Sequence, residues 1–232
     1  MIRAILLDIE GTTTPIAFVH EILFSYARDH AKEFLVNNAD AEEDMVRLRE
    51  EHAADVSNGN QPPALSDDID SMVAYVEWLI ARDRKSTGLK SLQGKIWRQG
   101  YTDGSLKSQV YADVAPAFAR WCARGWTISI FSSGSVLAQQ LLFAHTEAGD
   151  LTGFISEYFD TNVGKKGDPK SYRKIAETLN VRPDEVLFVS DIVAELDAAK
   201  EAGMQTLLSI RPGNQPQQSA ESYDAIHSFE SV

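Results

Sequence analysis

The sequence predicts an α/β protein with a doubly wound, mostly parallel β-sheet and a helical insert early in the chain. Three observations support this fold class: short apolar runs, helical patterns between them, and a long stretch without strand signals. The apolar runs lack polar alternation, as buried parallel strands do. They are Ile2–Leu7, Thr127–Phe131, Val186–Val189 and Gln205–Ile210. The intervening helices are expected at Val114–Arg124, Val136–Ala144, Tyr172–Leu179 and Glu195–Ala202.

The stretch that follows the first strand shows helical periodicity only. Apolar residues recur at helical spacing in Ile22–Val36, Met45–Leu48 and Met72–Ile80. This pattern indicates an insert at residues 16–104, which divides the α/β core into residues 1–15 and 105–232. The hinges are expected at Thr14-Pro15 on entry and at Gly100–Gly104 on return, where turn-forming residues gather.

Composition narrows the class of partner and the compartment. The 232 residues carry 22 Lys and Arg against 34 Asp and Glu, a formal charge of −12. This balance argues against a nucleic acid or an anionic membrane as partner, because either requires a basic face. The N-terminus does not resemble a signal peptide, and no apolar run is long enough to span a bilayer. The single cysteine, Cys122, allows no internal disulfide and is expected to be packed. We therefore expect a cytoplasmic protein.

Polar residues follow three of the expected strands where each strand ends. Asp8 and Glu10 follow the first strand, Ser132-Ser133 follow Thr127–Phe131, and Asp191 follows the strand that begins at Val186. Ligands of open α/β sheets bind beyond the carboxyl ends of the strands. A basic loop that contains Lys166 precedes the next helix and is expected at the same edge.

These residue types suit phosphoryl transfer. Three carboxylates without an arginine repel one another, and an oxygen-rich site of this kind favours Mg²⁺. Ser132 and Ser133, at the start of a helix, can hold a phosphate, and Lys166 adds positive charge. Asp8 can accept a phosphoryl group as nucleophile, and Glu10 can act as general acid and base.

Each residue also has a purely structural interpretation. An aspartate at a strand end often caps a helix or forms a turn, and Asp191 could do so. A serine-rich loop is common, and paired lysines are usually solvated. Glu195 resembles a charge on a helix surface. The functional interpretation depends on the four motifs occurring in order at successive strand ends or beside them.

The ordered motifs resemble the haloacid dehalogenase superfamily. Its pattern is a strand-end Asp with an acidic residue two positions on, a strand-end Ser or Thr, a lysine and a final acidic site. Asp8, Ser132, Lys166 and Asp191 match in order. Glu10 departs from the pattern, because phosphatases of the superfamily usually carry Asp at that position.

Longer segments resemble the enolase-phosphatase branch of this superfamily, which acts in methionine salvage. They are DIEGTTTPIAFVH, GKIWRQGY, FSSGSVLAQQLLF, GKKGDPKSYRKIA and RPGN. The resemblance implies a helical cap at the insert and a monomer that uses one Mg²⁺. It implies Asp8, Glu10 and Asp191 at the metal and Ser132, Ser133 and Lys166 at the substrate.

The implied reaction converts 2,3-diketo-5-methylthiopentyl-1-phosphate to an acireductone and phosphate, by enolisation and then dephosphorylation. Asp8 is the implied nucleophile, and the substrate is a small phosphorylated diketone. Two other functions stay open at this point. One is a general sugar-phosphate phosphatase or mutase of the same superfamily, and the other is a binding module that has kept the fold without catalysis.

Overall fold

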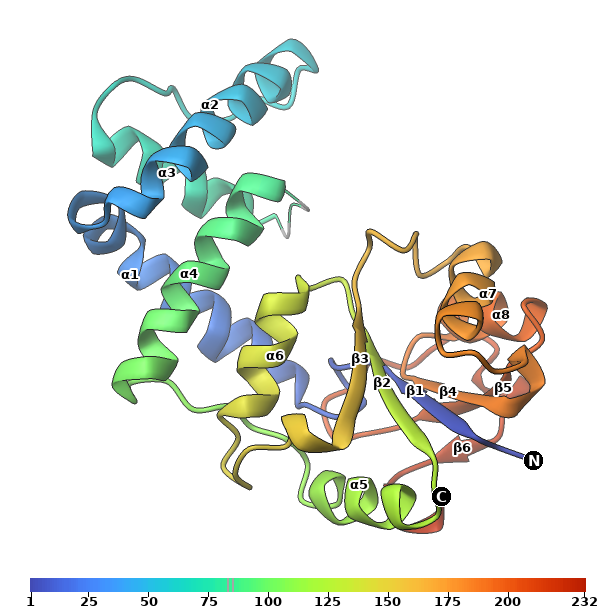
Figure 1. Cartoon of the computed structure of the whole chain (residues 1–232). Coiled ribbons are helices and arrows are strands. Elements are labelled where there is room, and N and C mark those ends of the chain that lie inside the picture. The colour runs from blue at the N-terminus through green and yellow to red at the C-terminus, as the bar shows by residue number, and fades with distance from the viewer. Residues whose placement is uncertain (83, 85) are drawn as a thin grey trace. The chain divides into compact units, whose positions relative to one another are not determined.

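A computed structural model describes residues 1–82, 84 and 86–232. The chain forms two compact units, one from Met1–Val19 with Lys107–Val232 and the other from His20–Leu106. We call the first the sheet unit and the second the helical unit, and Figure 1 shows the elements of both.

The sheet unit contains one sheet with the strand order β3-β2-β1-β4-β5-β6, in which every pair is parallel. Its strands are β1 (Ala4–Leu7), β2 (Thr127–Phe131), β3 (Ile155–Phe159), β4 (Val186–Ser190), β5 (Gln205–Ser209) and β6 (Ala225–Ile226). Its helices are α5 (Val114–Ala123), α6 (Val136–Ala144), α7 (Pro169–Thr178) and α8 (Val193–Glu201). This confirms the predicted parallel α/β fold.

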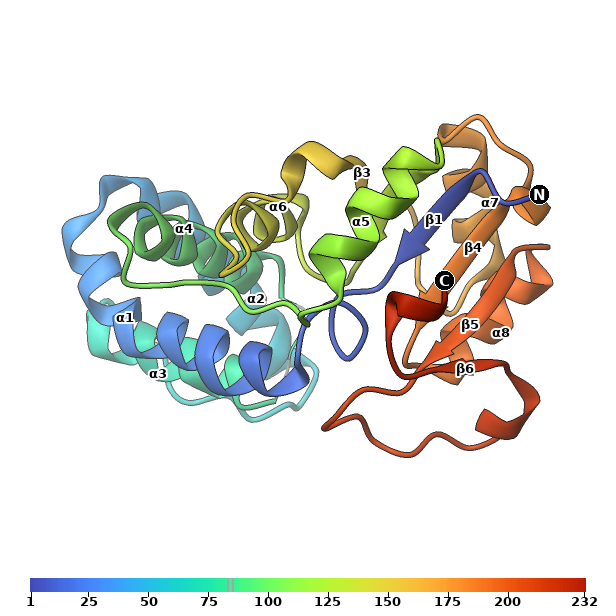
Figure 2. The same cartoon turned by 90° about the horizontal axis from the view of Figure 1, so that it is seen from below.

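Helices cover both faces of this sheet. Figures 1 and 2 show α5 on one face and α7 with α8 on the other. Leu6 and Phe188 pack with Ile175 and Leu196 of α7 and α8 in one buried cluster. Alternate residues of a strand point to opposite faces, and both faces are covered by helices. Every side chain of β1 is therefore buried, and the strand has no polar position. This explains why its sequence is a continuous apolar run.

Two strands lie outside the predicted set. β3 is an edge strand, and its central residues Ser156 and Glu157 are exposed, so it carries no continuous apolar run. β6 is only two residues long. Cys122 is also not packed as expected, because it lies exposed on α5.

The helical unit contains α1 (Phe24–Asn37), α2 (Glu42–Ser57), α3 (Ile69–Ile80) and α4 (Thr87–Asp103). A π-helical turn at Phe18–Leu23 precedes α1. α1 contacts α3 and α4, and α2 also contacts α4. Buried apolar side chains from all four helices form one core, which includes Leu35, Leu48, Val76 and Leu92.

α4 covers most of the segment Gly100–Gly104, where the sequence predicts the return hinge. Gly100 lies inside this helix, and Gly104 ends it with a left-handed φ of 81°. A Cβ added at Gly100 would lie 2.5 Å from the Tyr26 hydroxyl, and one at Gly88 would lie 3.0 Å from Leu48. Close packing of α4 therefore requires glycine despite its low helix propensity.

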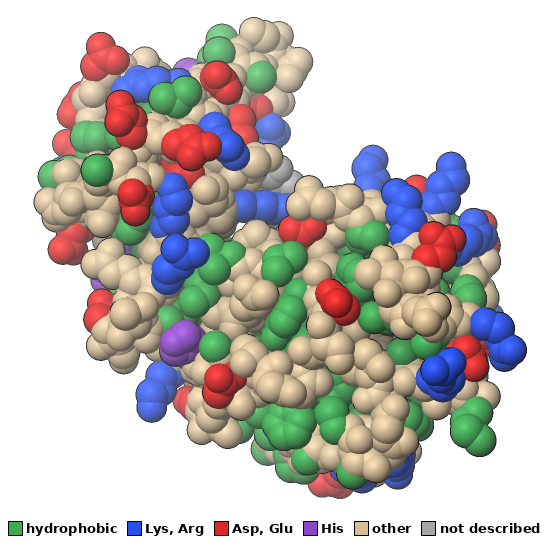
Figure 3. All heavy atoms as spheres, in the orientation of Figure 1, with side chains coloured by type: hydrophobic (Ala, Val, Ile, Leu, Met, Phe, Trp, Pro, Cys, Tyr) green, Lys and Arg blue, Asp and Glu red, His purple; other side chains and the backbone are tan. Residues whose placement is uncertain are grey.

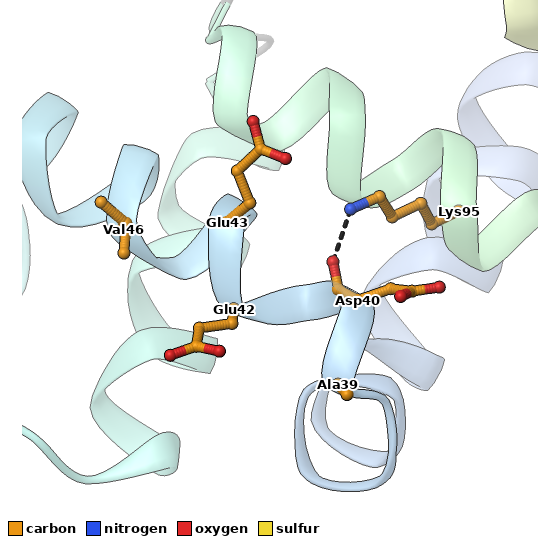
Figure 4. Close-up of a pocket in the computed structure, with 6 residues that line it drawn as sticks. All are labelled: Ala39, Asp40, Glu42, Glu43, Val46 and Lys95. Carbon is orange, nitrogen blue, oxygen red and sulfur yellow. Dashed lines mark hydrogen bonds between the residues drawn. The ribbon is translucent and has the colours of Figure 1, made fainter.

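A pocket of about 510 Å³ lies on the helical unit, where α2 begins beside α4 (Figure 4). Its lining residues are Ala39, Asp40, Glu42, Glu43, Val46 and Lys95. The Lys95 Nζ atom donates to the Asp40 carbonyl at 2.5 Å and pairs with Asp44 at 2.8 Å. The amine is thus engaged within the fold, and the other charged side chains of the lining are carboxylates.

Candidate active site

The strand order brings the predicted residues of three strands to one edge of the sheet. β1 lies between β2 and β4, and all three are parallel. Asp8, Ser132 and Asp191 directly follow these strands. The backbone N–H of Asp8 donates to Val189 of β4 at 3.0 Å, so the sheet ladder continues to the candidate nucleophile.

Lys166 contacts the Asp8 carboxylate directly. Its Nζ atom lies 2.6 Å from Asp8 Oδ1 and 2.8 Å from Glu195 Oε2, and the exposed fractions of the three side chains are only 10%, 8% and 14%. Burial lowers the pKa of the Lys166 amine, but these two carboxylates more than offset it and raise the pKa above its ordinary value. Lys166 is therefore a buried cation and not a solvated loop charge.

The loop that carries Lys166 is held by the first turn of α7. The Tyr172 hydroxyl donates to the Lys166 carbonyl and the Ser171 hydroxyl to the Lys165 carbonyl, both at 2.7 Å. Asp168 caps the same helix by accepting from the N–H of Lys170. These bonds fix the backbone from which the amine reaches Asp8.

Glu195 belongs to the same cluster, although its sequence context suggests a helix-surface charge. It lies in the first turn of α8 and accepts from the Ser190 hydroxyl at 2.9 Å. Burial and the nearby negative charge of Asp8 raise the pKa of Glu195 to about 7. The available signal was its position four residues after Asp191, in the first turn of the helix that follows a central strand.

Asp191 adds a third carboxylate to this edge. Its exposed fraction is 6%. Burial, and then the charges of Asp8 and Glu195, raise the pKa of Asp191 to about 7. Among the described residues, Lys166 is the one amine that contacts Asp8 and Glu195. The cluster therefore carries an excess of negative charge that a bound cation would neutralise.

The oxygen donors of this cluster fit Mg²⁺. Mg²⁺ is commonly held by one or two carboxylates together with water and substrate phosphate. Asp8 and Asp191 supply two such carboxylates. In residues 1–82, 84 and 86–232, no three Asp, Glu, His or Cys side chains gather at metal-binding spacing. Glu10 is half-buried and pairs through its backbone with Thr14, and its role as a third ligand stays a prediction.

Gly11 allows the first strand end to approach Asp191. Its φ is +63°, and a Cβ there would lie 2.5 Å from Asp191 Oδ2 and 2.8 Å from Asn214 Oδ1. The Gly11 carbonyl accepts from Asn214 Nδ2 and from the Ser209 hydroxyl, each at 3.0 Å. The turn after Asp8 is thus fastened to the end of β5 and to the segment beyond it.

We expect Gly11→Ala to destabilise the protein more than Gly125→Ala. Gly125 also has a positive φ, +78°, but a Cβ there meets nothing within 4 Å. Backbone strain should lower the free energy of unfolding by about 1–2 kcal/mol in both variants. Collision with Asp191 should remove roughly a further 1–3 kcal/mol from Gly11→Ala. Urea denaturation measures the free energy of unfolding of both variants. Equal losses would show that the Asp191 side chain moves aside without an energetic cost.

Ser132 and Ser133 lie in the loop that leads into α6. The Ser132 hydroxyl accepts from the N–H of Gly134 at 3.1 Å, and Ser135 caps α6 by accepting from Ala138 at 3.3 Å. Both predicted serines are partly exposed. The loop therefore combines hydroxyl groups with the N-terminus of a helix, which is a favourable arrangement for a phosphate.

Basic side chains surround α7 despite the net charge of −12. Lys165, Lys170, Arg173 and Lys174 are exposed. Figure 3 shows blue side chains grouped over this part of the sheet unit. Such a local field can raise the association rate of an anionic substrate even when the whole protein is acidic.

Comparison with known proteins decides the family. Residues 2–203 match haloacid dehalogenase-like hydrolases. The chain is 52% identical over 234 residues to a protein of Synechococcus elongatus named Enolase-phosphatase E1, with 100% of this chain and 98% of the relative covered. The chain belongs to the haloacid dehalogenase-like hydrolase family.

Two further proteins are similar to this chain over nearly all of their length. Enolase-phosphatase E1 of Sorangium cellulosum is 50% identical over 224 residues, covering 97% of this chain and 94% of the relative. The crystal structure of the UTR4 protein of Saccharomyces cerevisiae has a TM-score of 0.81 and 35% identity, and 100% of both chains is covered. These matches confirm the family that the ordered motifs predict.

Proposed function

We propose that this haloacid dehalogenase-like hydrolase is a Mg²⁺-dependent enolase-phosphatase of methionine salvage. Its substrate is 2,3-diketo-5-methylthiopentyl-1-phosphate, and its products are the acireductone and phosphate. The observation that carries the proposal is the buried contact of Lys166 with Asp8, at 2.6 Å, at an edge of the sheet shared with Ser132 and Asp191. The relatives named Enolase-phosphatase E1, of which 98% and 94% are covered, support the choice of substrate.

Dephosphorylation begins with attack of the Asp8 carboxylate on the substrate phosphorus. The bond between phosphorus and the substrate oxygen breaks, and that oxygen takes a proton from Glu10. Water then attacks the aspartyl-phosphate and gives a proton back to Glu10, which releases phosphate and restores both residues. Lys166 holds Asp8 in place and balances the charge of the phosphoryl group in both steps.

Enolisation comes first: the carbon next to a ketone loses a proton and the ketone oxygen gains one, which converts the ketone to an enol with no net change in atoms. Asp8 and Asp191, with Glu10 as the third proposed ligand, would hold Mg²⁺, which would supply the charge that polarises the substrate carbonyl. Ser132 and Ser133 hold the phosphate at the N-terminus of α6 during this step. We assign the chemistry to the sheet unit and propose that the helical unit is a cap.

The proposed setting is a monomer in the cytoplasm, without a nucleic-acid or membrane partner. The single cysteine and the net charge of −12 support this setting. No helix in the part of the chain that the structure describes is long and apolar enough to cross a membrane.

Turnover of the diketone phosphate tests the function. With Mg²⁺ present, we expect acireductone and phosphate to form in equal amounts, with strong preference over a panel of sugar phosphates. Equal or better turnover of a sugar phosphate would favour a general phosphatase. Isomerisation without phosphate release would favour a mutase. Mg²⁺ binding without turnover of any phosphate ester would indicate a non-catalytic module.

A further inference from the structure

A buried glutamine ties the serine loop to the neighbouring strand. Gln139 lies on α6 with an exposed fraction of 1%. Its Nε2 atom donates to the Gly134 carbonyl at 2.9 Å and to the Phe159 carbonyl at 2.8 Å. The Phe159 carbonyl also accepts from the N–H of Ser132 at 3.1 Å. One side chain therefore connects the middle of the loop with the acceptor that holds the start of the loop.

The orientation of this amide follows from its partners. Both partners are carbonyl oxygens, so the NH₂ group of Gln139 must face them and the amide oxygen must point elsewhere. That oxygen, Oε1, is buried and has no hydrogen-bond partner among the described residues. An unpaired buried acceptor lowers the stability of the folded protein. This indicates that Gln139 does not serve stability alone.

The bond to Gly134 determines which groups the loop can present to an anion. Because Gln139 is buried, the Gly134 carbonyl that bonds to it points toward the protein interior. In a planar trans peptide the N–H lies opposite the carbonyl, so the N–H of Ser135 points away from Gln139. If this peptide rotated, the N–H of Ser135 would turn toward the interior. The Gly134 carbonyl oxygen would then take its place on the side away from the interior. A carbonyl oxygen repels phosphate, whereas an N–H binds it.

We propose that Gln139 is a positioning residue for phosphate recognition, which it supports by holding the Gly134–Ser135 peptide and the start of the loop. It acts through the backbone and does not touch the substrate. The inference rests on the proposed function in one respect, namely that Ser132 and Ser133 receive the phosphate of the substrate. Gln139 takes no part in the proposed chemical steps, and its effect should therefore fall on the affinity for phosphate.

A matched pair of variants tests the proposal. Gln139→Met keeps the length of the side chain and removes both donors, whereas Gln140→Met makes the same change at the exposed neighbour on α6. Titration calorimetry with inorganic phosphate and Mg²⁺ should show about tenfold weaker binding for Gln139→Met, the effect expected for two lost hydrogen bonds. Gln140→Met should bind phosphate as the wild type does.

Steady-state kinetics separate positioning from a loss of folded protein. Partial unfolding lowers kcat and leaves KM unchanged, because only the folded fraction turns over. We expect Gln139→Met to raise KM for the phosphorylated substrate by a similar factor of about ten. If folded Gln139→Met binds phosphate as tightly as Gln140→Met and has the same KM, the proposal is wrong.

Two further results complete the test. Should Gln139→Met fail to fold, Gln139→Glu preserves the size and a polar end but supplies at most one donor, and it should show an intermediate loss of phosphate affinity. Unchanged affinity in that variant would overturn the proposal. Wild-type protein that binds phosphate but does not turn over the diketone phosphate would contradict the proposed function, while the comparison of the variants would still test the role of Gln139.

Discussion

Asp8→Asn should abolish phosphate release, with a fall in kcat of roughly 10⁴ or more, the scale of losing a nucleophile. The amide that replaces the carboxylate is a poor nucleophile toward phosphorus and cannot form the acyl phosphate. It also carries no charge to pair with Lys166, which now lies 2.6 Å from Asp8 Oδ1. Phosphate release from the diketone phosphate measures the change.

The control for this variant is Asp224→Asn, the same substitution at an exposed carboxylate of the sheet unit. It should keep the wild-type rate, and circular dichroism should show that both variants fold. Mass spectrometry of the wild type during turnover should detect a phosphorylated peptide that contains Asp8. Wild-type rates in folded Asp8→Asn would show that another residue is the nucleophile.

Lys166→Ala should reduce kcat by roughly 10² to 10³, which corresponds to about 3–4 kcal/mol for one lost electrostatic donor. The variant leaves Asp8 and Glu195 without the amine that contacts both carboxylates. Their mutual repulsion then opposes both the attack by Asp8 and the approach of an anionic phosphate. Initial rates at saturating substrate and Mg²⁺ measure the loss.

Lys165→Ala provides the matched comparison, because the adjacent lysine is exposed and is not among the residues that contact Asp8. Its rate should stay within a factor of about two of the wild type, as for most surface substitutions. Equal rates for the two lysine variants would contradict the assignment of Lys166 to the phosphoryl group. Thermal unfolding of both proteins separates a loss of catalysis from a loss of structure.

Strands buried on both faces were predictable from the sequence, and those at the sheet edge were not. β1, β2 and β4 lie at the centre of the sheet, where every position is apolar or small. β3 lies at the edge, and solvent allows it a serine and a glutamate. The pattern of apolar and polar residues along a strand reflects its burial, and burial differs between the centre and the edge of one sheet.

α4 was missed for a different reason. Its three glycines, Gly88, Gly94 and Gly100, indicate a turn when local propensity alone is considered. The partner side chains that require glycine at two of these positions, Leu48 and Tyr26, come from α2 and α1. No local pattern contains that information, because it depends on packing between helices.

The residues of the candidate site also divide into those that the sequence predicts and those that it does not. Asp8, Ser132 and Asp191 were predictable because each directly follows a strand, and parallel topology brings strand ends together. Glu195 was missed although it lies in the first turn of α8, because its partner Lys166 comes from a loop 29 residues earlier in the chain. Gln139 gave no signal either, because its two partners are backbone carbonyls, one of them at the end of the unpredicted strand β3.

The strand that precedes the candidate nucleophile is synthesised before both of the strands that pair with it. Ala4 pairs with Thr127 on one side and with Val186 on the other, whereas His20–Leu106 is a continuous segment. Contacts between residues close in sequence form faster than distant ones. The helical unit can therefore fold during synthesis while β1 still lacks its partner strands. The sheet edge with the candidate site is completed only when synthesis has passed β4.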